Sequence, residues 1–180
     1  MKISTKQVAQ TGLLLAICIA SQFFKNLSVY VTGPIVNAVI ILAVLAVGLC
    51  SGLILSVLAP ITSYFLSASP IIAAIPWVMP MIMLGNCILA ICVWFFEKKL
   101  RFSIRLPIGL VTGAFLKAGF MTIAIVNILF SLFGNALNEK QMAMGRSMFS
   151  ITQLVTALTG GLLAYCIFLP LQKFLKNENP

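Results

Sequence analysis

The sequence predicts an all-α membrane protein with six transmembrane helices and both termini in the cytoplasm. Of its 180 residues, 61% are hydrophobic and only 8% are charged, and the mean hydropathy is +1.12. A water-soluble domain of ordinary composition does not reach these values. No charged residue occurs from Asn26 to Phe96, a stretch long enough for three spans of about 20 residues each. We therefore expect one integral-membrane domain over residues 1–180.

Apolar runs place the six spans in order along the chain. The first run follows Lys2 and Lys6; a signal peptide has the same pattern, but we expect this run to remain as an uncleaved first span. Gly48, Ser51 and Gly52 divide the longest run into two, because one helix over all of it would overshoot a hydrocarbon core of about 30 Å. The predicted spans are approximately 8–24, 34–50, 51–67, 77–96, 106–134 and 147–170.

The basic residues predict the orientation of these spans. Short loops rich in lysine and arginine stay in the cytoplasm, so the more basic side is expected to face inward. This topology also accounts for the net charge of +9, which in a soluble protein would suggest nucleic acid as a partner. The side that holds both termini carries Lys2, Lys6, Lys98, Lys99, Arg101, Arg105, Lys173 and Lys176, and the other carries Lys25, Lys140 and Arg146.

The connections on the outer side contain proline and glycine between apolar residues. They cover residues 25–34 and 68–76. Such segments suit a lid over a pocket that opens outward, although loops that rest on the bilayer surface would have the same composition.

Lys117 is the most informative residue of the chain. It is the only charged residue between Arg105 and Glu139, and it lies near the middle of the fifth predicted span. A charge at the centre of a membrane helix costs about 3 kcal/mol on insertion scales, so an ionisable residue at this depth indicates a functional site. A helical wheel places it on one face with Gly109, Gly113, Phe120, Ala124 and Asn127.

Other polar or aromatic residues of the spans are candidates for contact with a substrate. Asn86 is expected near the middle of the membrane, and Asn37 and Gln153 nearer the outer ends of their spans. Structural hydrogen bonds between helices, worth about 1 kcal/mol each, are the alternative for every amide. The outer aromatics could stack on a heterocycle or serve only as interfacial anchors. The candidate substrate-binding residues are Lys117, Asn86, Asn127, Gln153, Asn37, Trp77 and Tyr30.

Several absences narrow the function. The three acidic residues, Glu97, Glu139 and Glu178, lie at connections or in the tail, and the chain has no histidine. A proton-coupled carrier normally needs a titrating acid or histidine inside the membrane. There is no phosphate-binding loop, catalytic pair or metal set, so we expect no enzyme, no cofactor in this chain, and energy supplied by another subunit. Lys117 is then either uncharged without ligand or paired with oxygens of the ligand.

The first span carries small residues at four-residue spacing, Gly12, Ala16 and Ala20, which would let a second helix approach closely. With the segment Ala16-Ile-Cys-Ile-Ala20 and the Gly48 hairpin, the chain resembles the S components, the substrate-binding membrane subunits of energy-coupling factor (ECF) vitamin transporters. The likeness covers nearly the whole chain, and the stretch from Ile75 to Asn86 is similar to members without an assigned substrate.

This resemblance implies a subunit in the bacterial plasma membrane that captures a vitamin or a related small heterocyclic or acidic micronutrient from outside. It implies docking through Gly12, Ala16 and Ala20 on a transmembrane coupling protein, with two ATPase subunits that use ATP. No ligand motif of the riboflavin, thiamin or biotin members is present, so the substrate stays open. Two alternatives remain: a binding or scaffolding subunit of another membrane complex, and a self-sufficient small carrier or channel.

Overall fold

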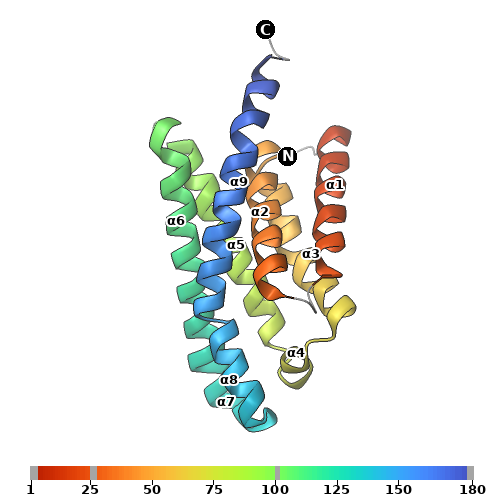
Figure 1. The fold of residues 1–180 in the computed structure, drawn as a ribbon, viewed down its shortest axis with the longest axis vertical. Coiled ribbons are helices and arrows are strands. Elements are labelled where there is room, and N and C mark those ends of the chain that lie inside the picture. The colour runs from red at the N-terminus through yellow and green to blue at the C-terminus, as the bar shows by residue number, and fades with distance from the viewer. Residues whose placement is uncertain (1–3, 25–27, 100–101, 178–180) are drawn as a thin grey trace.

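The structure, a computed structural model, describes residues 4–24, 28–99 and 102–177, and these residues form helices without a strand. Long helical segments run along one axis, and the described ends nearest the two termini lie at the same end of the bundle (Figure 1). The long segments are α1 (Thr5–Gln22), α2 (Val29–Ala46), α3 (Leu49–Ser67), α5 (Val78–Lys99), α6 (Phe102–Met121) with its continuation, and α9 (Ile151–Asn177).

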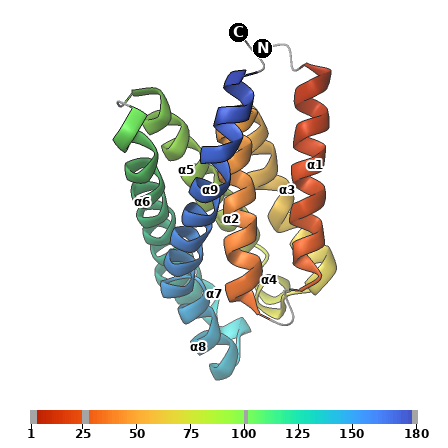
Figure 2. The ribbon, with the colours of Figure 1, turned by 45° about the horizontal axis from the view of Figure 1, so that its top comes forward.

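The shorter elements gather at the opposite end of the bundle (Figures 1 and 2). The segment after α6 continues as the π-helix η1 and the short helix α7, and then turns through the 3₁₀-helix η2 into α8. These elements are α4 (Pro70–Ala74), η1 (Thr122–Leu129), α7 (Phe130–Phe133), η2 (Gly134–Ala136) and α8 (Glu139–Met148).

Five helices of the described chain are long and apolar enough to cross a membrane by length and composition, which is consistent with a multi-pass membrane protein. The candidate spans are Val29–Ala46, Leu49–Ser67, Val78–Lys98, Leu106–Ala136 and Glu139–Gln172. Helix α1 is not among them, because its first two turns carry Lys6, Gln7 and Gln10. The sixth span therefore stays a prediction.

Helix α2 begins five residues before the predicted span, because the segment read as an outer loop is already helical. The Ser28 side chain accepts a hydrogen bond from the Tyr30 N–H and caps the helix. Pro34, which suggested a loop, lies inside α2. The part of the predicted loop at 25–27 lies outside the described residues.

The tight turn predicted between the second and third spans is present, but only Gly48 of the residues expected to form it lies in the turn, and Ser51 and Gly52 lie inside α3. Helix α2 ends at Ala46 and α3 begins at Leu49. Gly48 has a φ of 131°, a conformation that residues with a side chain rarely adopt. The two helices therefore form an antiparallel pair.

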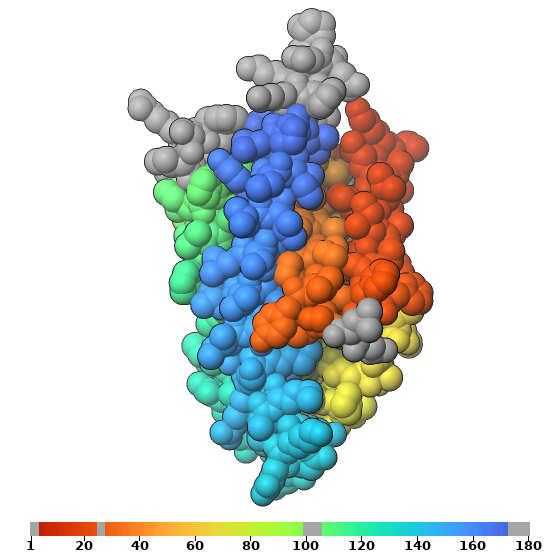
Figure 3. Space-filling view, viewed as in Figure 1, coloured from red at the N-terminus to blue at the C-terminus, as the bar shows by residue number. Residues whose placement is uncertain are grey.

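Helix α2 is the central helix of the bundle and packs against α1, α3, α5 and α9. On one side of the molecule α2 and α9 lie next to each other, with α1 along the edge (Figure 3). Their close approach depends on Gly160, since a Cβ there would lie 2.6 Å from the Pro34 carbonyl oxygen.

Two apolar clusters fill the interior. The first, near the end of the bundle that holds the termini, is built around α2 residues 38–44 with Leu55, Leu89 and Phe168. The second joins α4 to the start of α5 and the end of the fifth span, and includes Ile72 and Phe130. Buried polar side chains that include Asn37, Asn86 and Lys117 lie between these clusters.

Candidate functional site

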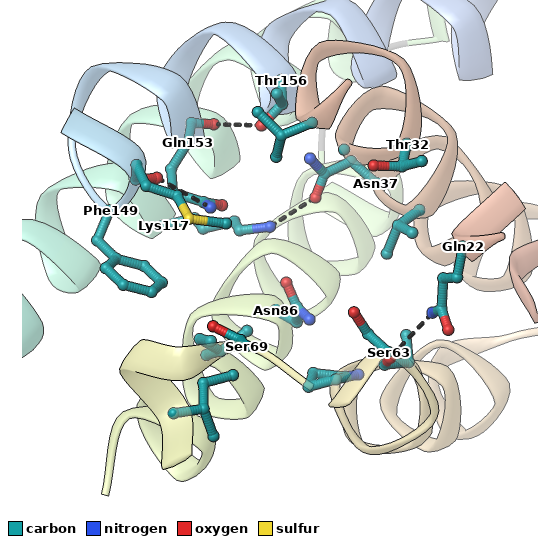
Figure 4. A pocket seen from close by; sticks show the side chains of 18 residues that line it. Gln22, Thr32, Asn37, Ser63, Ser69, Asn86, Lys117, Phe149, Gln153 and Thr156 are labelled. Carbon is teal, nitrogen blue, oxygen red and sulfur yellow. Dashed lines mark hydrogen bonds between the residues drawn. The ribbon is translucent and has the colours of Figure 1, made fainter. Parts of the chain in front are cut away.

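A cavity of about 120 Å³ lies between the long helices, in the half of the bundle away from the termini. All of the long helices contribute to its wall (Figure 4). Its polar side chains come from the last turn of α1, the first half of α2, the second half of α3, the segment before α4, the middle of α5, the end of α6 and the start of α9. They are Gln22, Thr32, Asn37, Ser63, Ser69, Asn86, Lys117, Gln153 and Thr156.

Lys117 reaches this cavity from α6 and is only 3% exposed. Its Nζ donates a hydrogen bond of 2.5 Å to Oδ1 of Asn37 on α2 (Figure 4), the one hydrogen bond of this amine in the described structure. None of the described residues that line the cavity is acidic. An ammonium group has three donors, so the remaining donors are available to another oxygen.

Gln22 lies across the cavity from Lys117, on the last turn of α1 (Figure 4). Its Nε2 donates to the Ala59 carbonyl oxygen at 3.0 Å. Its Oε1 is the one buried side-chain oxygen or nitrogen within the described residues that lacks a hydrogen-bond partner. Gln22 was not among the residues predicted from the sequence; the available signal was a glutamine four residues after Cys18 at the end of an apolar run.

Two further candidates, Asn86 and Gln153, also line the cavity. Asn86 Nδ2 makes a long contact of 3.4 Å with the Ser56 carbonyl oxygen, and Gln153 Nε2 donates to the Met148 carbonyl oxygen at 3.3 Å. Asn86 lies between Lys117 and Gln22 in Figure 4. The structure thus brings together four of the seven predicted substrate-binding residues, with Lys117 and Asn37 in direct contact.

Asn127 does not line the cavity and is exposed. The helical wheel assumed 3.6 residues per turn, but the chain from Thr122 to Leu129 is a π-helix. Its i→i+5 hydrogen bonds take more residues per turn, which rotates Asn127 by roughly a quarter of a turn relative to an α-helix. The π-helix therefore explains why Asn127 leaves the face of Lys117.

Tyr30 and Trp77, the predicted aromatic contacts, lie outside the cavity lining and are 57% and 61% exposed. The Tyr30 hydroxyl shares a hydrogen bond of 3.3 Å with Thr152 Oγ1, so it joins α2 to α9. Trp77 directly precedes α5, at the end of the bundle away from the termini. Both positions suit an interfacial aromatic residue.

The cavity is closed on two sides by apolar residues. Towards the termini, the first apolar cluster fills the bundle around α2. At the opposite end, α4 covers the cavity, with Ile72 and the preceding Ser69 in its lining. Helix α4 occupies the connection at 68–76 in which a lid was predicted. The short helix is anchored there by Ile71 and Ile72, which are buried in the second apolar cluster.

The predicted docking face of α1 is unobstructed in the described part of the chain. Gly12, Ala16 and Ala20 are exposed, and a Cβ added to Gly12 would meet no described atom within 4 Å. Helix α1 lies at the edge of the molecule (Figure 3), so a partner helix could approach this face.

No protein-family model, curated protein or solved structure is significantly similar to the chain. Its function is therefore inferred from the cavity and from the sequence.

Proposed function

We propose that this protein is the solute-binding subunit of a membrane importer and that Lys117 contacts the solute. The observation that carries the proposal is the buried Lys117 amine, which faces a polar cavity with a neutral amide as its one partner among the described residues. A lysine at this depth costs about 3 kcal/mol, and one interhelical hydrogen bond in a membrane offsets only about 1 kcal/mol of it. Acceptor oxygens of a solute would offset the remainder.

The apolar interior favours a binding subunit over a channel or a self-sufficient carrier. A channel needs a polar path from one side to the other, whereas the first apolar cluster lies between the cavity and the end that holds the termini. Release on that side requires the helices to move apart. The chain has no phosphate-binding loop to drive such a movement, so another subunit would supply the energy.

More specifically, we assign the protein to the S components of ECF-type vitamin importers, in a bacterial plasma membrane with six spans and cytoplasmic termini. The sequence resemblance supports this assignment, and so does the exposed small-residue face of α1. In this account Gly12, Ala16 and Ala20 dock on the coupling protein, and two ATPase subunits hydrolyse ATP. The captured solute is a vitamin or a related micronutrient.

Mass spectrometry of small molecules that co-purify with the detergent-extracted protein tests solute binding. Wild-type protein should retain one metabolite, and Lys117→Met should lose it, because methionine is a long unbranched side chain that donates no hydrogen bond. Leu116→Met is the matched control: its neighbouring position on α6 is exposed, so the metabolite should remain. An equal metabolite content in wild type and Lys117→Met would overturn the proposed role of the lysine.

Co-purification with ATPase subunits from the native membrane tests the transporter assignment. Ala16→Trp combined with Ala20→Trp should remove the ATPases while the metabolite is retained, because the bulky rings block close helix approach without reaching the cavity. Ile17→Trp is the control and should keep the ATPases: the position is exposed, already bulky, and turned about 100° around α1 from Ala16. ATPases that persist with the double variant would refute this docking face.

A further inference from the structure

We propose that the ligand of the cavity is a compact monocarboxylate. In this arrangement the carboxylate lies against Lys117. The inference rests on the proposed solute-binding function and adds the chemical class of the solute.

The charge of the ligand follows from the lining of the cavity. Lys117 is the single cationic side chain among the described lining residues, and none of these is acidic. One carboxylate balances one ammonium group and can accept hydrogen bonds from the Lys117 N–H groups that do not bond to Asn37. A phosphate monoester carries a charge of about −1.5 to −2 at pH 7, so it would bury negative charge that no second cation of the described lining offsets. A cationic ligand would face Lys117 without a counter-charge.

The size of the ligand follows from the cavity volume of about 120 Å³. For comparison, an engineered apolar cavity of about 150 Å³ inside a protein binds benzene. The cavity therefore suits a ligand core of roughly one small ring or a short chain. A large dinucleotide or a flavin would require the helices to separate.

Thermal stability of the full-length protein in detergent tests the class of ligand. The probes are small hydroxy- and amino-substituted monocarboxylic acids, each paired with its primary amide, and phosphate monoesters and amines of the same size. At least one acid should raise the melting temperature while its amide does not, and Lys117→Met should abolish the shift. Leu116→Met should preserve it.

The other outcomes separate this inference from the proposed function. Stabilisation by amines or phosphate monoesters, with none by the acids up to millimolar concentration, would overturn the ligand class and leave solute binding intact. If no probe of any class stabilises the protein and no metabolite co-purifies, both proposals fail.

Discussion

The substitution Asn37→Asp distinguishes a ligand-binding Lys117 from a lysine that only joins two helices. Asn37 Oδ1 lies 2.5 Å from Lys117 Nζ, so the introduced carboxylate would occupy the place of the amide oxygen. A hydrogen bond to a charged partner is worth about 1.5–3 kcal/mol, against about 1 kcal/mol for an ordinary one. The new carboxylate therefore competes with the ligand by about 0.5–2 kcal/mol, which corresponds to roughly two- to thirtyfold weaker binding.

The assay is the amount of co-purified metabolite per protein after a timed wash, together with the melting temperature. Asn37→Asp should melt higher than wild type and retain less metabolite. Asn37→Leu, the control without charge, should melt lower and lose less metabolite than Asn37→Asp, because the Lys117 amine stays available. If Asn37→Asp melts higher but retains the wild-type amount of metabolite, Lys117 serves only to hold α6 against α2.

Three further predictions concern packing and surface positions. Gly160→Ala should destabilise the protein by about 1–3 kcal/mol and lower its metabolite content, since the new Cβ would lie 2.6 Å from a carbonyl oxygen of α2. The control Gly161→Ala, whose Cβ would have its nearest atom at 3.4 Å, should melt close to wild type. A lower melting temperature for Gly161→Ala than for Gly160→Ala would contradict this packing. Asn127→Ala and Trp77→Ala, both at exposed positions, should change stability by less than about 0.5 kcal/mol and leave the metabolite content unchanged. Loss of the metabolite from either variant would show that the site extends beyond the cavity. Gly12→Ala should raise the melting temperature slightly, because alanine favours a helix over glycine by about 1 kcal/mol. It should also weaken co-purification with the ATPases. Unchanged ATPase binding would argue against tight docking at Gly12.

The sequence was sufficient to predict the central part of the site, because the position of a polar residue within a hydrophobic run indicates its depth in the membrane. Lys117 and Asn86 lie near the middle of long hydrophobic runs, where a polar group needs a partner inside the protein. Helices of similar length that run side by side bring such groups to one level. Asn37, by contrast, was expected near the outer end of its span. Because α2 begins at Val29 and not at Pro34, Asn37 lies in the middle of the helix, where it meets Lys117.

The remaining differences between the predicted and the observed structure have local causes. The π-helix from Thr122 to Leu129 changes the rotation per residue, and its sequence contains no proline or glycine that would have indicated it. The helical wheel therefore misplaced Asn127. Helix α2 starts at Val29 because Ser28 caps it, while Pro34 suggested a loop. Gln22 was overlooked because it stands at the end of its apolar run, where a polar residue normally faces water or lipid headgroups.

The most direct test of the central claim is an experimental structure of the protein with its co-purified metabolite, determined for wild type and for Lys117→Met. In wild type we predict ligand density in the cavity, with a ligand oxygen within about 3.2 Å of Lys117 Nζ, and no such density in the variant. Ligand density elsewhere in wild type, or the same density in the cavity of Lys117→Met, would contradict the claim that this buried lysine holds the solute.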